Sequence, residues 1–427
     1  MNIFDQLLAD NQIPKFVRVR HEMDHSHIDD IEGAVAQAMR REGTLDRIKP
    51  GDSVCITAGS RDVANIARII RAICDQVKSV GAHPFIIPAM GSHAGAKAEG
   101  QRGIIEGYGV TEEAMGAPIR ASMDTEVIAH SRSGLEIHLD KFANAADFLI
   151  PVGRIKAHTD FRGEVESGIC KMLVIGMGKQ HGAYQCHKLG FKSMAANVKE
   201  FAGAIIEKKP NMFAIGLIEN AYHQTCRIEA IPAGRILEEE PPLLEYAKSR
   251  MAKVPFDQAD ILFVDETGKD ISGAGMDPNV TGRSAQNGIS RPFAERIVAR
   301  DLTDEAHHNA TGMGNADVTT RRLFDKIDME QTYPNSLTSR DINGFRIPIV
   351  MENDDLAIRF ALHTITGANA ESGYRAMWIR DTNHVQTFYV TERLLADTAA
   401  MPWLRTDGVA LRPVFGADGY FTGWERA

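Results

Sequence analysis

The feature that most constrains the fold is a strand–helix–strand pattern between residues 53 and 88. Ser53–Thr57 is a short apolar run rich in β-branched residues, and residues 63–80 carry Ile and Val at helical spacing. Gly81 ends this helix, and His83–Pro88 supplies a second buried strand. A unit of this kind joins parallel strands by a right-handed crossover, and open α/β sheets bind ligands at the carboxyl ends of their strands. The pattern therefore predicts an α/β domain with a site at these two strand ends.

Length and a second set of apolar runs predict two α/β domains. A chain of 427 residues is too long for one simple core. In the second half, strands are indicated at residues 259–265, 345–351 and 376–380, and a helix at residues 354–365. A helix over 235–253, interrupted near Pro241-Pro242, is followed by Pro255, which suits a domain junction. We therefore place one domain at 1–255 and the other at 256–427.

Charge and cysteine content exclude several classes of protein. The chain has 48 Lys and Arg against 57 Asp and Glu, a net charge of −9, and no basic run, which argues against nucleic-acid binding. Five cysteines without a Cys-x-x-Cys pair argue against a disulfide framework and a zinc ribbon, and fit a reducing cytoplasm. No signal pattern or membrane-length apolar run is present. The sequence predicts a cytoplasmic protein without nucleic-acid or membrane partners.

Four residues in the first half share a chemical theme. His93 and His158 each follow a predicted strand, Lys171 follows a glycine-containing turn, and His187 lies further along the chain. Imidazole serves both as a metal ligand and as a general base. A single histidine among the fifteen is more often structural, but the joint placement of these residues indicates a reactive site.

Four short motifs occur in a fixed order between residues 50 and 190. They are Gly59-Ser60-Arg61, Gly91-Ser92-His93, Arg154-Ile155-Lys156-Ala157-His158 and Ser167-Gly168-Ile169-Cys170-Lys171. In this order and spacing the chain resembles the nickel-dependent lactate racemase family. The resemblance implies an isomerase that inverts C2 of a 2-hydroxy carboxylate, here a polar or sugar acid. It also implies that the two domains enclose a cleft for cofactor and substrate.

The resemblance implies a role for each motif residue. The cofactor would be a nickel-pincer nucleotide, a pyridinium mononucleotide joined to Lys171 through a thioamide, whose nickel is held by carbon, two sulfurs and His187. His93 and His158 would remove the hydroxyl proton on either face while C2 delivers hydride to the cofactor. Arg61 would bind the substrate carboxylate, or with Ser60 the cofactor phosphate. Such a protein depends on cofactor-biosynthesis enzymes and can lack the cofactor when produced without them. A homo-oligomer is compatible with the sequence.

Departures from the family pattern concern the substrate. Ala58 and Ala157 stand where the family has Asp and Pro, and the segment from His158 to Lys171 is longer. Its charged residues Arg162, Glu164 and Glu166 line the pocket or solvate a loop. The family's Tyr-Gln-x-x-Lys element has no match. A glycine-rich segment, residues 268–283, offers as substrate ligands Lys269, Asp277, Asn279 and Arg283, with a structured surface loop as the alternative.

Other readings stay open at the level of sequence. Cys170 and Cys186 flank the proposed cofactor residues and are either thiolate ligands or apolar filler. His307-His308 suits a loop or a supporting role. A zinc hydrolase would use His93, His158 and His187 with Glu164 as base, which leaves Lys171 without a role. A non-catalytic sugar-acid or nucleotide-binding protein would need neither His93 nor His158, and no Gly-x-Gly-x-x-Gly fingerprint supports a nicotinamide dehydrogenase.

Overall fold

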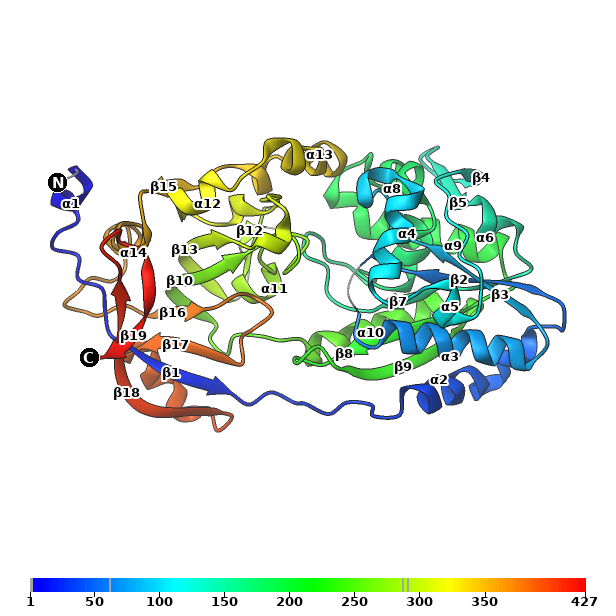
Figure 1. Ribbon diagram of the computed structural model, residues 1–427, viewed down its shortest axis with the longest axis horizontal. Coiled ribbons are helices and arrows are strands. Elements are labelled where there is room, and N and C mark those ends of the chain that lie inside the picture. The colour runs from blue at the N-terminus through cyan, green and yellow to red at the C-terminus, as the bar shows by residue number, and fades with distance from the viewer. Residues whose placement is uncertain (1–2, 61–62, 286–287, 290–291) are drawn as a thin grey trace. The chain divides into compact units, whose positions relative to one another are not determined.

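The computed structural model describes residues 3–60, 63–285, 288–289 and 292–427, and the chain separates into two α/β units (Figure 1). The N-terminal unit is Asp24–Met251. The C-terminal unit combines Met1–Met23 with Ala252–Ala427. The predicted class of two α/β domains is confirmed, whereas the cleft expected between them stays a prediction.

The division of the chain differs from the expected 1–255 and 256–427 at its N-terminus. Strand β1 (Phe16–His21) pairs antiparallel with β17 (Thr387–Thr391) and β18 (Leu404–Phe415), so it completes the C-terminal sheet. Phe16 and Val19 are buried there. Nothing local in a six-residue strand shows which partner it will have, and sequence proximity pointed to the first domain.

The predicted strand–helix–strand unit is confirmed in the N-terminal unit. β2 (Ser53–Ala58) runs parallel to β3 (His83–Pro88), and α3 (Ile66–Ser79) connects them. The third strand, β6 (Phe148–Ile150), pairs parallel with β2 on its other side. The carboxyl ends of these strands therefore lie at one edge of the sheet.

The remaining elements of the N-terminal unit complete two further sheets and their helices. The strands are β4 (Thr125–His130), β5 (Glu136–Asp140), β7 (Val152–Arg154), β8 (Phe213–Glu219) and β9 (Thr225–Pro232), paired as β4-β5 and β7-β8-β9. The helices are α2 (Ile31–Arg40), α4 (Ala98–Gly107), α5 (Glu112–Met115), α6 (Lys141–Ala145), α7 (Ile169–Lys171), α8 (Lys179–His187), α9 (Met194–Lys208) and α10 (Ile236–Arg250).

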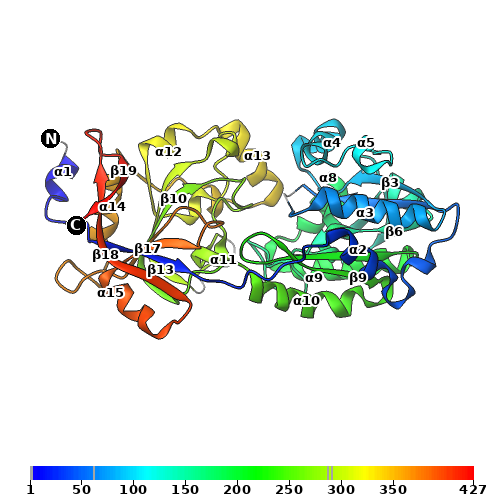
Figure 2. The ribbon, with the colours of Figure 1, turned by 60° about the horizontal axis from the view of Figure 1, so that its bottom comes forward.

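Side chains of β2 alternate between two apolar cores. Val54 and Ile56 pack with α2 and α3, while Cys55 belongs to the core formed with α7 to α10. Figure 2 shows α3 lying along the sheet. Helix α10 continues through Pro241 and Pro242, so the predicted interruption is wrong. Both prolines lie in its first two turns, and the next two residues, Leu243 and Leu244, are buried.

The C-terminal unit is built on one nine-stranded sheet. Its strand order is β15-β14-β13-β10-β16-β17-β1-β18-β19, parallel from β15 to β16 and antiparallel from there. The strands not yet given are β10 (Gln258–Thr267), β13 (Phe293–Leu302), β14 (Val318–Thr320), β15 (Ile349–Met351), β16 (Ala376–Ile379) and β19 (Phe421–Arg426), beside the small pair β11 (Arg283–Ser284) and β12 (Gly288–Ile289). The helices are α1 (Ile3–Leu7), α11 (Pro278–Thr281), α12 (Arg321–Asp325), α13 (Met329–Ser339), α14 (Asp354–His363) and α15 (Glu392–Leu395).

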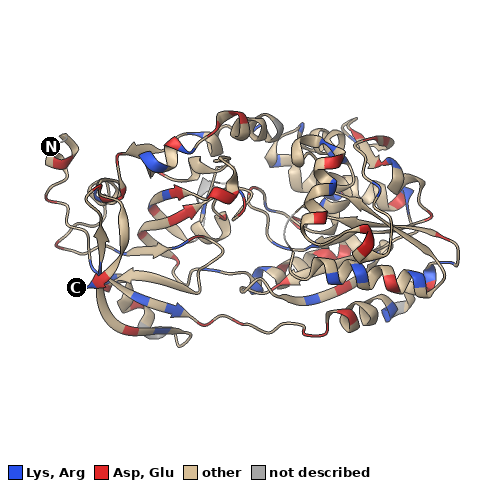
Figure 3. Cartoon of the chain, in the orientation of Figure 1, with Lys and Arg blue, Asp and Glu red and all other residues tan. Residues whose placement is uncertain are grey.

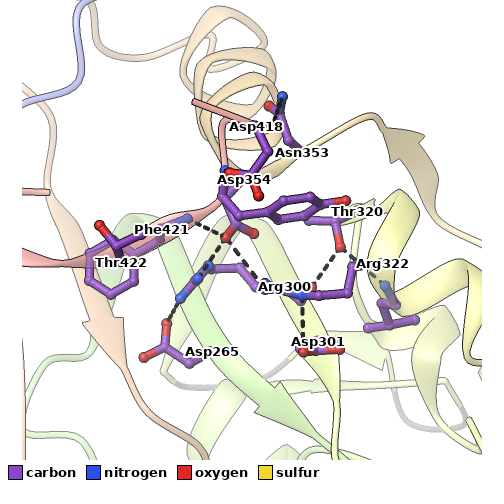
Figure 4. Close-up of polar contacts among 12 residues, drawn as sticks. Asp265, Arg300, Asp301, Thr320, Arg322, Asn353, Asp354, Asp418, Phe421 and Thr422 are labelled. Atoms are coloured by element: carbon purple, nitrogen blue, oxygen red, sulfur yellow. Dashed lines mark hydrogen bonds and ion pairs between the residues drawn. The ribbon is translucent and has the colours of Figure 1, made fainter. Parts of the chain in front are cut away.

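A buried ionic network ties four elements of this unit together (Figure 4). Arg300 of β13 pairs with Asp265 of β10 and, at 2.7 Å, with Asp354 at the start of α14. Asp354 also accepts the backbone N–H of Phe421 at 2.8 Å, which fixes the last strand to the sheet. Burial raises the pKa of Asp265, and the Arg300 charge opposes that rise.

Acidic and basic residues are interspersed in both units (Figure 3). Among the described residues, no helix combines the length and the apolar character needed to cross a bilayer.

Candidate active site

The turns after β2 and β3 meet at Ser60 and His93. The Ser60 hydroxyl lies 2.5 Å from Nδ1 of His93, and the Tyr108 hydroxyl donates to the Ser60 carbonyl at 2.9 Å. Neighbouring parallel strands end at the same edge, so residues 33 positions apart come into contact. Arg61, expected beside Ser60 as a cofactor and substrate ligand, lies outside the described residues.

Gln101 holds the backbone of the His93 turn. Its fully buried side chain donates to the carbonyls of Gly91 at 2.9 Å and His93 at 3.3 Å. Gly91 has φ of 62°, and a Cβ there would lie 3.1 Å from Cγ2 of Ile175. The glycine of the Gly-Ser-His motif thus permits both the left-handed turn and its close approach to the segment after Lys171.

The segment that carries Lys171 packs against both turns. Helix α7 ends at Lys171, and a π-helical turn, Met172–Gly176, follows it. A Cβ on Gly176 would lie 2.9 Å from the carbonyl oxygen of Ala89, and one on Gly59 would lie 3.4 Å from Cε of Met172. Single π-helical turns of this kind are frequent at functional sites. The Lys171 segment therefore contacts the ends of both β2 and β3.

Lys171 and His158 are in direct contact. Nζ of Lys171 lies 2.8 Å from Nε2 of His158, while Nδ1 of the ring accepts the backbone N–H of Asp160 at 2.9 Å. The ring stacks on Phe161 with 4.1 Å between centroids. Burial lowers the pKa of His158 well below its ordinary value, and positive charge at Lys171 or His187 would lower it further. The imidazole is therefore neutral near pH 7.

These contacts indicate which ring nitrogen of His158 carries the proton. A neutral imidazole has a single N–H. Because Nδ1 of His158 accepts a hydrogen bond, the proton is on Nε2, which faces Lys171. The lysine nitrogen then acts as the acceptor, which only an unprotonated amine can do. An amine in this state is a nucleophile, and attachment to an electrophilic group requires one.

Glu166 supports the loop that carries His158. Its fully buried carboxylate accepts the backbone N–H of His158 at 2.7 Å and pairs with Lys248 of α10 at 3.0 Å. Glu164, the base of the zinc alternative, is exposed and pairs with Lys199. Arg162 donates to the backbone carbonyl of His158. Glu166 and Arg162 therefore shape the loop around His158, whereas Glu164 lies on the surface.

His187 is the last residue of α8, and its tautomer suits a metal ligand. Nδ1 lies 2.7 Å from the carbonyl oxygen of Ala183. A carbonyl can only accept, so Nδ1 carries the hydrogen and the lone pair is on Nε2. Metal-binding histidines typically donate their second ring N–H to such an acceptor.

A buried lysine anchors the other end of α8. The Lys179 amine donates to the Pro88 carbonyl at the end of β3 and pairs with Asp140 of β5 at 3.2 Å. Both side chains are fully buried. Burial lowers the pKa of Lys179, opposed by the Asp140 charge. The helix that ends at His187 is thus fixed to the sheet edge where the two turns begin.

The two cysteines beside the proposed cofactor residues are protonated thiols. Burial raises the pKa of Cys186 to about 12 and raises that of Cys170 well above its ordinary value. Both side chains belong to the apolar core of α7 to α10. The apolar-filler reading therefore accounts for them.

Several supporting residues were not predicted from the sequence. Arg154, within a motif, pairs with Glu219 at the end of β8, and Glu219 accepts the backbone N–H of Ala64 at 2.7 Å. This pair joins the ends of β7 and β8 to the segment before α3. Its members and Gln101 are far apart in the chain, and no local pattern marks them. The only sequence signal for a site in this region was the high density of motif residues at strand ends.

The predicted substrate ligands of the second domain lie in the C-terminal unit, where each contacts the protein itself. Asp277 caps α11 by accepting the Asn279 N–H at 2.9 Å, Arg283 pairs with Asp317, and Lys269 donates to Asn335. Their role with substrate stays a prediction.

Glycines of this segment serve backbone packing. A Cβ on Gly275 would lie 2.6 Å from the carbonyl oxygen of Thr311, and one on Gly312 would overlap Ala274. The loop after β10 is therefore held against the loop that follows His307-His308. His308 itself contacts the Lys326 carbonyl at 2.9 Å, in line with a loop role.

The residues that the structure describes contain no group of three or more His, Cys, Asp or Glu side chains arranged to hold a metal ion. The hypothesis of a three-histidine zinc site at His93, His158 and His187 is therefore supported by the sequence alone.

Comparisons with solved structures give partial likenesses, of which two are described. The lactate racemase apoprotein from Thermoanaerobacterium thermosaccharolyticum is 16% identical, with a TM-score of 0.45 over 67% of this chain and 74% of that one. A Thermotoga maritima protein solved by structural genomics is 11% identical, with a TM-score of 0.43 over 64% of this chain and 71% of that one. No family model and no curated protein matches the sequence. Neither likeness identifies the family.

Proposed function

We propose that this protein is a racemase or epimerase that inverts C2 of a polar 2-hydroxy carboxylate, using a nickel-pincer nucleotide attached to Lys171. The observation that carries the proposal is the 2.8 Å contact between Nζ of Lys171 and Nε2 of His158, whose Nδ1 accepts the backbone N–H of Asp160. A zinc hydrolase or a simple binding protein has no use for a nucleophilic amine in this place.

The residues present fit the cofactor that the motifs imply. Lys171 supplies the nitrogen for attachment, and His187 presents an Nε2 lone pair of the kind that nickel accepts. Ser60 and the turn after β2 would hold its phosphate. When bound, the cofactor would accept a hydride from C2 and return it to either face.

The two proposed bases start from different tautomers. At His93, Ser60 can accept from Nδ1–H, which leaves Nε2 able to take the substrate hydroxyl proton. At His158, Nε2 carries the proton while Lys171 is unmodified. Acylation removes the basic lone pair of the lysine nitrogen, so we expect the His158 proton to be redistributed on cofactor attachment.

The first test is intact mass and metal analysis of protein co-produced with pincer-biosynthesis enzymes. We expect a mass increase located at Lys171 and stoichiometric nickel in the wild type and in Lys192→Ala, which removes an exposed lysine nearby. Lys171→Ala should carry neither. If a control racemase is loaded and this protein gains no adduct and no nickel, the proposal is wrong.

The second test follows the C2 hydrogen. Hydride removal and return predicts that a 2-deuterated substrate is inverted with its deuterium retained, whereas proton abstraction at C2 would exchange it with water. Inversion is measured by chiral chromatography across a panel of sugar acids and short 2-hydroxy acids, and isotope content by mass spectrometry. Loss of the label to solvent would exclude the proposed mechanism.

A further inference from the structure

A buried carboxyl group lies beneath the segment that carries Lys171. Glu240 of α10 is fully buried, and its Oε2 accepts the backbone N–H of Cys170 at 2.8 Å. Its other oxygen, Oε1, has no hydrogen-bond partner. Glu240 is 70 positions away from Cys170 and is part of no motif.

Glu240 also explains the glycine of the Ser-Gly-x-x-Lys motif. Gly168 has φ of 170° and ψ of −150°, an extended conformation that any residue can adopt. A Cβ at this position would nevertheless lie 2.1 Å from Oε1 of Glu240. The lack of a side chain at Gly168 therefore leaves room for the carboxyl group, and any Cβ there would displace it.

The carboxyl group takes the place of a missing helix cap. The first N–H groups of a helix have no partner within it, and a side chain at the N-cap usually satisfies one. The N-cap of α7 is Gly168, which has no side chain. Glu240 supplies the acceptor from a neighbouring helix, immediately before the residue that contacts His158.

The burial of the Glu240 carboxyl group indicates that it has a specific role. Burial raises the pKa of its carboxyl group, and hydrogen bonds from Cys170 and Ile169 oppose that rise. An apolar residue would fill the same space without this desolvation penalty. What it could not do is hold the Cys170 N–H.

We propose that Glu240 is the positioning residue for Lys171: it holds the start of the Lys171 segment so that the lysine nitrogen meets His158. The inference rests on the proposed function only in taking Lys171 as the residue to which a cofactor is attached. The contact itself is a property of the unloaded protein, so it is tested without cofactor or substrate.

The experiment measures the rate at which a small amine-acylating reagent modifies Lys171 in unloaded full-length protein, with Lys192 as the internal reference. Peptide mass spectrometry gives both rates at a temperature where every variant is folded. We expect Glu240→Ala to lower the Lys171 rate on the order of tenfold. Glu240→Gln, which keeps an acceptor for the Cys170 N–H, should stay close to the wild type.

A double-mutant cycle tests the steric part independently. Gly168→Ala should lower both stability and Lys171 labelling in the wild type, because its Cβ meets Glu240. In the Glu240→Ala background the same substitution should have little effect. Equal effects of Gly168→Ala in both backgrounds would overturn the inference. So would an unchanged Lys171 labelling rate in a destabilised Glu240→Ala variant, which would show a structural role alone.

These outcomes are separable from the proposed function. A protein that never loads nickel but shows the labelling pattern keeps the positioning role and loses the cofactor assignment. A protein that loads normally, with Lys171 labelling insensitive to Glu240, keeps the cofactor and loses the positioning role.

Discussion

At the scale of single residues, the site combines reactive groups with buried charges that keep them in place. His158, Lys171 and His187 supply the chemistry, and each has a specific hydrogen bond that sets its proton. Lys179 and Glu240 are buried ionisable residues outside the chemistry. Burial of such groups is unfavourable unless they are paired or hydrogen-bonded, so their loss should be measurable.

Lys179→Met should be strongly destabilising, because it leaves Asp140 buried without its counter-charge. We expect a loss of about 3–5 kcal/mol in the free energy of unfolding, measured by urea denaturation. The double variant Lys179→Met/Asp140→Asn should recover part of the loss. A double variant that is less stable than the sum of the single changes would contradict the pairing.

His158 should make stability depend on pH in a defined direction. Its pKa is lowered in the folded state, so below about its ordinary value of 6.5 the unfolded chain binds more protons than the native one. Stability should therefore fall as the pH drops from 6.5 toward the folded pKa. Unfolding curves between pH 7.5 and 5 should show a shallower dependence for His158→Gln, whereas His181→Gln, at an exposed position, should keep the wild-type slope.

At the scale of elements, the sequence predicted what periodicity and strand-end rules determine. The unit from β2 to β3 and the placement of Ser60 and His93 at one sheet edge follow from apolar spacing and parallel topology. The contact between Lys171 and His158 was not predictable, because it depends on how a π-helical turn packs. Glu240 was missed because Cys170, the residue it contacts, is distant in sequence.

The turn after β3 offers a matched pair of glycine substitutions. Gly91 and Gly95 have nearly equal φ, 62° and 63°, but only Gly91 has close neighbours. Gly91→Ala should be less stable than Gly95→Ala by roughly 1–3 kcal/mol, the cost of overpacking against Ile175. It should also reduce C2 inversion more, since it displaces His93. Thermal unfolding and kcat compare the two, and equal effects would mean that φ alone matters.

At the scale of the whole molecule, the chain passes twice between its units, at residues 23–24 and 251–252. The N-terminal unit is continuous in sequence, and the C-terminal unit is not. Strand β1 lies between β17 and β18, and Phe16 packs edge-on against Trp378 and Trp424 at centroid distances of 5.7 and 5.4 Å. The sequence predicted two domains but not this insertion, since pairing partners of a lone strand are not encoded locally.

Fragments should therefore behave differently. Residues 24–251 produced alone should unfold cooperatively, because the unit contains its own cores. Residues 252–427 alone should be poorly folded, and addition of a 1–23 peptide should restore near-ultraviolet circular dichroism. A fully cooperative 252–427 fragment would show that β1 is dispensable.

The central position of β1 also means that it cannot pair until strands much later in the chain have been synthesised. Arg18 of β1 pairs with Asp407, 389 positions later, so at ribosomal speeds β1 waits roughly 20 to 80 s for its partner to be made. During that interval the N-terminal unit can complete its fold while an apolar strand remains unpaired. Two chains made side by side can then exchange their unpaired β1 strands once β17 and β18 are complete, so overproduction should yield some strand-exchanged dimer that slow expression suppresses.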